Sequence, residues 1–377
     1  MRARDLGITL DGTPGPLNAI TDVPGVEIGM VTIIEDTDDP AIAARTGVTA
    51  VLPLGRGGIG TALPAAVHSL NGNGELTGSH WLRESGGLTG PVMITNTHAV
   101  GPVHRGVVDW TARNRPELAA AWLLPVVAET WDGYLNSINE PFVTTAHAEQ
   151  AIETAIGGPV LEGSFGGGTG MNCYGYKGGN GTSSRLVPFG GATYTVAAFV
   201  QANFGSRHEL SIRGISMAGI DAPNPMGETD WFLEDQQSGR SRVPGGAGSV
   251  IAVIATDAPL LPMQCEALAR RVPMGLARTG TTGGHFSGDI FLAFTTANPG
   301  ALGSSFPIER PEAATLRSLE MVPWGYMDPF YAAVVHCVEE AVINALVSNG
   351  TMTGRSGHLS PALPIDEVRR RLASVSP

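Results

Sequence analysis

The chain has 377 residues, of which 42% are apolar and 15% charged, a composition typical of a compact globular protein rather than a disordered one. Its 35 acidic residues outnumber 23 basic ones, and the net charge of −12 argues against nucleic acid as the main partner. Only one lysine is present, Lys177, which excludes a polybasic patch for membrane surfaces.

Strand-like runs recur along the chain, rich in Val, Ile, Thr and Phe and bounded by Gly or Pro. Several are apolar at nearly every position, which suits sheets covered on both faces. Helical patterns lie between and after them, and the mixed order predicts an α/β or α+β class. The predicted strands are 47–54, 91–98, 193–204, 209–217, 249–256 and 289–296, and the predicted helices are 148–156, 262–271, 328–348 and 365–373.

The clearest predicted helix is 328–348, with Asp328 as N-cap, Pro329 at the first helical position and Asn349-Gly350 as the stop. No stretch approaches about 18 uninterrupted apolar residues, so no transmembrane helix is expected. The N-terminus has no apolar region of the kind found in signal peptides. We therefore expect a cytoplasmic protein without a membrane partner.

Three cysteines, Cys173, Cys265 and Cys337, lie far apart and form no C-x-x-C pair, so we expect buried free thiols. The nine histidines show no H-E-x-x-H spacing, and no metal site is expected. The run Gly55–Gly60 fits G-x-G-x-x-G after a strand. Early Pro64 and a glycine-rich stretch soon afterwards favour a close-packed loop over a dinucleotide site.

Two other glycine-rich stretches, 166–170 and 177–182, resemble phosphate cradles. Neither has the G-x-x-x-x-G-K-[ST] spacing, because the lysine precedes its glycines. Structural turns are the simpler interpretation. No serine lies in G-x-S-x-G either, so the nucleophile elbow of α/β-hydrolases is absent.

The most informative local feature is the polar, glycine-rich stretch 235–248, which runs directly into the apolar strand SVIAVIAT at Ser249. A serine that becomes the first residue of a chain has its own α-amine, with an ordinary pKa of about 7.7–8.0. That amine can accept the hydroxyl proton without a histidine. Its release requires cleavage of Gly248–Ser249, which attack of the Ser249 hydroxyl on the Gly248 carbonyl would begin.

Several segments together resemble the L-aminopeptidase D-amidase/D-esterase family, which also contains the β-peptidyl aminopeptidases. The resemblance runs from about residue 5 to the C-terminal LPIDEVRRRLA, so it covers nearly the whole chain. The segments are LNGNGELTGSHW, ITNTHAVG, LLPVVAETWDGYLN, GGGTGMNCYGYKGGNGTSSR, VQANFG, GSVIAVIATDAPLLP and SGDIFLAFTTAN.

The resemblance implies a four-layer αββα sandwich, similar to N-terminal nucleophile hydrolases but with different strand connectivity. It implies one domain, 1–377, that cuts itself at Gly248–Ser249 into chains 1–248 and 249–377, with Ser249 as the new N-terminal nucleophile. Such enzymes need no cofactor and usually assemble as a tetramer of processed units. Expected substrates are short peptides, amino-acid amides or esters.

Further site residues follow from the same resemblance. Asn203 matches the oxyanion-hole asparagine, and Ser287 and Asp289 match a serine and an acidic residue beside the nucleophile. That acidic residue is Glu in some relatives, so the reach of the shorter Asp is open. Tyr134 matches a substrate-pocket position that is Tyr in the L-aminopeptidase branch and Glu in the β-peptidase branch.

The leading hypothesis is therefore a self-processing serine aminopeptidase with amidase and esterase activity. A β-aminopeptidase or a nylon-oligomer-type amidase on the same scaffold is the competing enzyme hypothesis. Two hypotheses from different classes also stay open, a binding protein whose loop is never cut and a nucleotide-dependent enzyme built on Gly55–Gly60.

Overall fold

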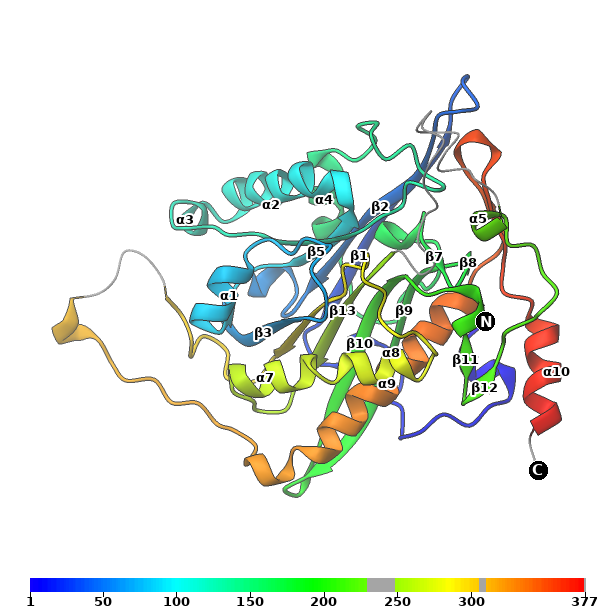
Figure 1. The fold of residues 1–377 in the computed structure, drawn as a ribbon. Coiled ribbons are helices and arrows are strands. Elements are labelled where there is room, and N and C mark those ends of the chain that lie inside the picture. Colours follow the sequence, from blue (N-terminus) through cyan, green and yellow to red (C-terminus); the bar gives the residue numbers. More distant parts are fainter. Residues whose placement is uncertain (229–247, 305–309, 376–377) are drawn as a thin grey trace.

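The computed structural model describes residues 1–228, 248–304 and 310–375. Two β-sheets face each other in the middle of the molecule, and helices cover the outer face of each sheet (Figure 1). This is the predicted αββα sandwich.

The smaller sheet has four strands in the order β1-β2-β5-β6, antiparallel except for the parallel pair β5 and β6. Helices α2 and α4 pack on its outer face, where apolar side chains from both helices meet the sheet. The bounds are β1 (Glu27–Asp36), β2 (Ala43–Leu52), β5 (Val92–Asn96), β6 (Val126–Thr130), α2 (Val100–Asn114) and α4 (Thr145–Glu153).

The larger sheet has six strands in the order β4-β3-β14-β13-β10-β9, with β13 and β14 parallel. Three helices, α7, α8 and α9, cover its outer face (Figure 1). The bounds are β3 (Leu63–Ser69), β4 (Gly87–Leu88), β9 (Gly179–Phe189), β10 (Ala192–Asn203), β13 (Ser249–Thr256), β14 (Ile290–Thr295), α7 (Pro262–Ala269), α8 (Val272–Ala277) and α9 (Asp328–Val347).

Short elements complete the described chain and lie at the edges of the sandwich. They include three two-residue hairpins and the C-terminal helix. Their bounds are α1 (Ser79–Ser85), α3 (Pro116–Ala119), β7 (Asn172–Cys173), β8 (Tyr176–Lys177), β11 (Ser211–Ile212), β12 (Ile215–Ser216), α5 (Pro225–Glu228), β15 (Met352–Thr353), β16 (Leu359–Ser360) and α10 (Ile365–Val375).

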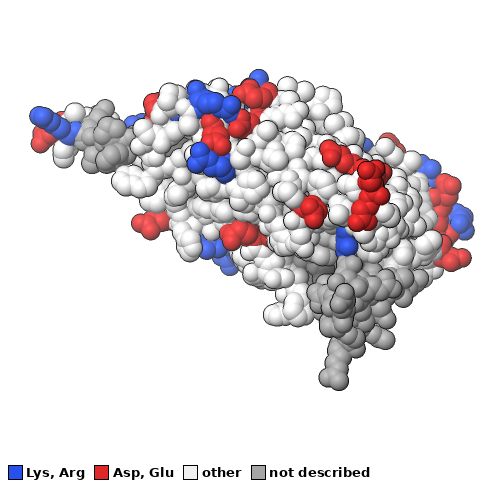
Figure 2. Space-filling view, turned by 90° about the horizontal axis from the view of Figure 1, so that it is seen from above, with Lys and Arg blue, Asp and Glu red and all other residues white. Residues whose placement is uncertain are grey.

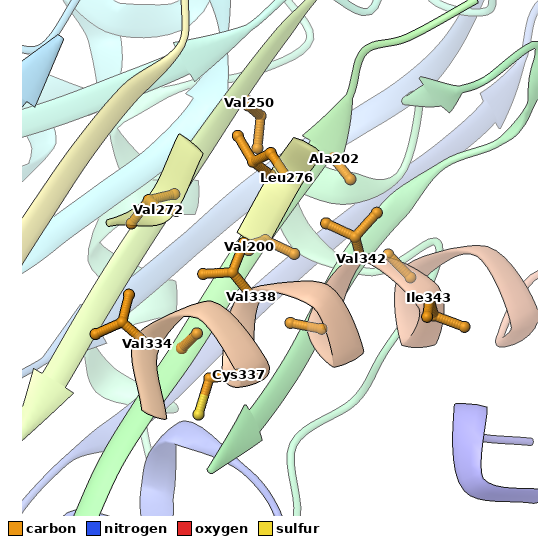
Figure 3. Close-up of a cluster of buried hydrophobic side chains, with 14 of the residues drawn as sticks. Val200, Ala202, Val250, Val272, Leu276, Val334, Cys337, Val338, Val342 and Ile343 are labelled. Atoms are coloured by element: carbon orange, nitrogen blue, oxygen red, sulfur yellow. The ribbon is translucent and has the colours of Figure 1, made fainter. Parts of the chain in front are cut away.

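Strand β13 shows why the central strands are apolar at nearly every position. Val250 and alternate residues after it face the layer of α7, α8 and α9, whereas Ile251 and its alternates face the other sheet. Figure 3 shows the first of these layers, with Val250 beside Leu276 of α8 and Val200 beside Val338 of α9. A strand buried on both faces needs no polar alternation.

Helix α9 is long and apolar enough to span a membrane, but 78% of its most apolar window is buried inside the protein. Its composition is therefore explained by packing against β9 and β10. The helix begins at Asp328, with Met327 rather than Asp328 at the N-cap, so the predicted start is wrong by one residue.

Most predicted elements are present with ends shifted by a few residues, and β13 has the predicted bounds. The predicted strand 209–217 is wrong, because it is a small hairpin of β11 and β12 that turns at Arg213 (φ 54°) and Gly214 (φ 75°). Two adjacent left-handed residues form a tight hairpin turn, which apolar alternation does not reveal. Of the predicted polar stretch, 235–247 lies outside the described residues.

The run Gly55–Gly60 leads through one 3-10 turn into β3, with no helix behind it. Since a dinucleotide fingerprint needs a helix N-terminus at this point, the nucleotide hypothesis has no support in the fold. The triplet Gly166–Gly168 also forms a 3-10 turn, where a side chain on Gly167 would overlap Gln201. These glycines permit close packing.

Charged residues are sparse on one face of the molecule (Figure 2). Figure 2 shows one face on which uncharged residues dominate and Lys and Arg side chains lie apart, many beside Asp or Glu. That face carries no continuous basic patch of the kind used to bind nucleic acid.

Candidate active site

Ser249 is the first residue of β13 and is only 3% exposed. It lies directly opposite Asn203, the last residue of β10, in the antiparallel pair. Opposed residues share one face of a sheet, so the two side chains point the same way. That face is the one that carries Ile251 and Val253, the space between the two sheets. The preceding residue must be glycine, because a Cβ on Gly248 would overlap the carbonyl oxygen of Asn203.

The segment Ser287–Asp289 lies against the Gly248–Ser249 peptide from the β14 side. Gly248 forms a parallel bridge with Ser287, and its carbonyl oxygen accepts a hydrogen bond of 3.2 Å from the Gly288 N–H. The Ser287 hydroxyl donates to Asp289 Oδ1 at 2.5 Å, and the Val250 N–H donates to the same oxygen at 3.2 Å. A carboxylate and a hydroxyl therefore flank the predicted nucleophile.

Asn71, on the loop after β3, holds the Asp289 residue at two points. Its Oδ1 accepts from the Asp289 N–H at 2.6 Å, and its Nδ2 donates to Asp289 Oδ2 at 3.2 Å. Burial raises the pKa of Asp289, while hydrogen bonds from Ser287, Asn71 and Val250 oppose that rise. The carboxylate is thus rigidly placed and easier to protonate than an exposed Asp.

The Asn203 amide is fixed by two main-chain groups. Its Oδ1 accepts from the Asn172 N–H at 2.8 Å, and its Nδ2 donates to the Trp131 carbonyl at 2.8 Å. An amide nitrogen has two hydrogens, so one donor remains after the bond to Trp131. Because Asn203 faces the same side as Ser249, that donor suits the oxygen on which negative charge develops.

Glu129, near the end of β6, is a carboxylate that the residue patterns did not single out. It is 3% exposed; its Oε1 accepts from the Glu75 N–H at 2.9 Å, and its Oε2 accepts from the Thr97 hydroxyl. A Cβ on Gly74 would lie 3.3 Å from this Oε1 and 2.8 Å from Cα of Gly288. The Glu129 carboxylate therefore adjoins the turn that covers the nucleophile.

Burial raises the pKa of Glu129, and the bonds from Thr97 and Glu75 oppose the rise. Both of these donors are neutral groups, and a buried carboxylate held by neutral donors favours a cationic ligand. The signal in the sequence was an acidic residue at the end of an apolar run, VVAET, which indicates a buried carboxylate at a strand end.

Tyr134 lies in a small cluster with Leu135, against which Trp131 packs. Its side chain is buried, stacks on His358 with ring centres 4.8 Å apart, and its hydroxyl donates to the Leu359 carbonyl at 3.2 Å. Burial raises the pKa of Tyr134 to about 12. The ring thus contacts the segment leading into β16, and the substrate role expected for it stays a prediction.

In the described ranges, no group of three or more His, Cys, Asp or Glu side chains is placed to hold a metal ion. The three cysteines are buried and unpaired with one another, and burial raises the pKa of each thiol. None is suited to act as a thiolate nucleophile.

The structure brings Ser249, Asn203, Ser287 and Asp289 together at one end of the larger sheet, on β13, on β10 and in the segment that leads into β14. Their catalytic roles stay predictions. Tyr134 is not joined to them by any of the contacts described, whereas Glu129 and Asn71 are new members of the site.

A model of peptidase family S58 matches residues 18–360 of the chain. Two curated β-peptidyl aminopeptidases named BapA are similar to it. That of Sphingosinicella microcystinivorans is 44% identical over 99% of this chain and 93% of its own. That of Sphingosinicella xenopeptidilytica is 42% identical over 98% and 90%.

Solved structures resemble the chain along its whole length. The L-aminopeptidase D-Ala-esterase/amidase of Ochrobactrum anthropi, described as a new variant of the Ntn hydrolase fold, has a TM-score of 0.86 at 42% identity and covers 99% of this chain and 98% of its own. A β-aminopeptidase from a Burkholderia species has a TM-score of 0.85 at 42% identity, covering 100% and 99%.

Proposed function

As the chain belongs to peptidase family S58 and is a hydrolytic peptidase, we propose that it is a self-cleaving aminopeptidase with Ser249 as its N-terminal nucleophile. The proposed reaction removes a small N-terminal residue from peptides, amides or esters. The observation that carries the proposal is the position of Ser249, at the start of a buried strand with Asn203 opposite and Asp289 beside it.

The first step is cleavage of the chain at Gly248–Ser249. The Ser249 oxygen attacks the Gly248 carbonyl carbon, its proton passes to the Ser249 nitrogen, the bond from that carbon to the nitrogen breaks, and an ester forms. Water then hydrolyses the ester and leaves a Gly248 carboxylate and a free Ser249 amine. The hydrogen bond from the Gly288 N–H to the Gly248 oxygen supports this step, since it stabilises the negative charge that develops there.

The second step uses the new amine as the base. It takes the proton of the Ser249 hydroxyl as that oxygen attacks the substrate carbonyl, and it returns a proton to the leaving amine. The Asp289 carboxylate raises the basicity of the amine by favouring its ammonium form. The free hydrogen of Asn203 Nδ2 stabilises the tetrahedral intermediate. An acyl-enzyme then forms and is hydrolysed by water.

Glu129 is proposed to bind the N-terminal ammonium of the substrate. It is a buried carboxylate beside the turn over the nucleophile, and a charge-assisted bond to an ammonium contributes about 1.5–3 kcal/mol. This requirement for a free amine would make the enzyme an aminopeptidase rather than a general amidase.

A second candidate is a preference for β-residues at the substrate N-terminus. It is favoured by the two curated relatives at 44% and 42% identity, both named β-peptidyl aminopeptidases. The expected role of Tyr134, a bulky side chain that shortens the pocket, favours α-residues. The ratio of kcat/KM for β-alanine p-nitroanilide to that for L-alanine p-nitroanilide decides between them.

We also propose that the processed units assemble as a tetramer. Exposed aromatic and aliphatic side chains support an interface, among them Trp122 at 79% and Leu316 at 102% exposure. Trp122 and the half-exposed Leu124 line a cavity of about 160 Å³ between α1 and α3. Light scattering on the purified protein gives the mass of the assembly, and a mass of one unit contradicts this proposal.

Intact mass and N-terminal sequencing of the purified protein test the proposed function. Two chains are expected, 1–248 and 249–377, the second beginning Ser-Val-Ile, with activity on L-alanine p-nitroanilide and none on its N-acetyl derivative. A single uncut chain that hydrolyses neither L-alanine p-nitroanilide nor β-alanine p-nitroanilide overturns the proposal and favours a binding protein.

A further inference from the structure

The catalytic steps proposed above leave one buried charged pair unused, Lys177 and Asp132. Both side chains are fully buried. Lys177 is the last residue of β8, and Asp132 follows the residue whose carbonyl holds Asn203. A buried charge destabilises the folded protein unless it has specific partners. A buried pair so close to Asn203 is therefore expected to have a function.

Lys177 makes its contacts with main-chain oxygens. Its Nζ donates to the Met171 carbonyl at 2.8 Å and to the Gly178 carbonyl at 2.7 Å. The Met171 carbonyl and the Asn172 N–H belong to one peptide group. The same N–H donates to Asn203 Oδ1 at 2.8 Å. One peptide group therefore connects the ammonium of Lys177 to the side chain of Asn203.

This connection determines how Asn203 presents its hydrogens. Because the Asn203 oxygen accepts from the Asn172 N–H, the Asn203 nitrogen lies on the opposite side of the amide group. One of its hydrogens then points to the Trp131 carbonyl, and the other is left for the oxyanion. The positive charge of the Lys177 ammonium, which donates to the Met171 oxygen, polarises the peptide group and strengthens its N–H as a donor. Hydrogen bonds in such a chain reinforce one another.

Asp132 supplies the opposing charge. Its Oδ1 accepts from Asn136 Nδ2 at 3.0 Å, and the Thr46 hydroxyl also stabilises its charged form. Burial raises the pKa of Asp132 to about 7 and lowers that of Lys177 to about 7, while attraction between the two opposes the shift of Lys177. Asp132 also shares a peptide group with the Trp131 carbonyl that accepts from Asn203.

We propose that Lys177 is a positioning residue for the oxyanion amide, acting on Asn203 through the Met171–Asn172 peptide group, with Asp132 as its counter-charge. The inference rests on the proposed role of Asn203 as the oxyanion donor. It adds that the donor is oriented and strengthened by a charge that never touches the substrate.

A double-mutant cycle tests the proposal on processed enzyme, with L-alanine p-nitroanilide as substrate and rates divided by the amount of Ser249 N-terminus. Lys177→Met is expected to lower kcat about 5- to 20-fold, less than loss of the donor itself, and to leave KM within about twofold. In an Asn203→Ala background the same substitution should change kcat less than about twofold. Equal losses in both backgrounds overturn the proposal.

Asn349→Ala is the matched control. Asn349 Nδ2 donates to the carbonyls of Lys177 and Gly178, so its loss loosens the same hairpin without touching the Met171–Asn172 peptide. It should lower the melting temperature and leave kcat unchanged. A drop in kcat equal to that of Lys177→Met would show that general loosening of the hairpin is the cause. If Asn203→Ala itself leaves kcat unchanged, the proposed function is at fault instead.

The single lysine allows a test that needs no substitution at Lys177, should that variant fail to fold. Enzyme labelled with 13C at lysine Cε has one such site per chain. Binding of 1-aminoethylboronic acid, which forms a negatively charged tetrahedral adduct with a serine nucleophile, should shift its NMR signal. The shift should be lost in Asn203→Ala. No shift in inhibited wild-type enzyme overturns the proposal.

Discussion

The two sheets contribute different groups to the candidate site. The six-stranded sheet provides Ser249 and Asn203 from paired strands and Asp289 at the start of β14. The four-stranded sheet provides Glu129 and, just beyond β6, the Trp131 carbonyl that orients Asn203. We infer that bond-making groups are fixed by the register of one sheet, whereas recognition of the substrate amine comes from the other.

The largest expected effect comes from Ser249→Ala, which removes the nucleophile of both proposed steps. The variant should remain one chain by denaturing gel, with turnover lowered about 10⁶-fold, as for loss of a serine nucleophile elsewhere. Ser183→Ala on β9, two strands away in the same sheet, is the matched control and should still be cut; the Ser183 hydroxyl donates to the Cys337 carbonyl. Cleavage in Ser249→Ala would contradict an intramolecular mechanism.

Asn203→Ala should lower kcat about 10²–10³-fold with a smaller effect on KM, because the lost hydrogen bond strengthens only in the transition state. Steady-state kinetics on L-alanine p-nitroanilide measure both constants. Asn114→Ala removes a similar amide-to-carbonyl bond on the outer helix α2 and should change neither. An unchanged kcat in Asn203→Ala would remove this residue from the oxyanion hole.

Glu129→Gln tests the proposal that the four-stranded sheet recognises the substrate amine. Loss of a charge-assisted bond should lower kcat/KM about 10- to 100-fold for substrates with a free amine. Self-cleavage, which involves no substrate amine, should proceed at the normal rate. Glu75→Gln, an exposed carboxylate on the adjacent loop, is the control. If cleavage slows as much as turnover, the division between the two sheets is wrong.

Asp289→Asn should have the smallest effect on the rate, about tenfold, together with a shift in its pH dependence. Without the carboxylate the Ser249 amine loses basicity, so the limb on which activity rises with pH should move to lower pH. Asp257→Asn, just after the far end of β13, removes the charge of another carboxylate that accepts from a main-chain N–H and should leave the profile in place. If the pH dependence of activity does not change in Asp289→Asn, Asp289 has a structural role only.

Asp289→Asn should lower the activity without lowering the free energy of unfolding. A raised pKa means that the folded state binds the proton more tightly than the unfolded state, so stability falls as pH rises from the ordinary Asp value through the folded pKa. Asn at position 289 does not ionise and avoids this loss. The comparison is made in the uncut Ser249→Ala chain, which has no ammonium at position 249, and there thermal unfolding at pH 7 should find Asp289→Asn at least as stable as its parent.

Much of the fold could be predicted from residue patterns. The run SVIAVIAT has the predicted strand bounds, and helix 328–348 was found to within one residue at each end. The strand predicted at 209–217 failed because Arg213 adopts a left-handed turn conformation that its residue type disfavours. Glu129 was overlooked because its partners come from the loop at 75 and the turn at 97, far away in the sequence.

By itself, the sequence determined which strands are buried on both faces, where the polar stretch meets Ser249, and the family to which the chain belongs. Only the tertiary structure decided which side chains share the site. Register places Asn203 opposite Ser249, and main-chain hydrogen bonds orient the amide toward it. Lys177 shows the reason: it precedes a glycine-rich stretch, but its proposed function depends on the hydrogen bond from the Asn172 N–H to the side chain of Asn203, which lies on another strand. Contacts of that kind arise from packing, and spacing along the chain does not encode them locally.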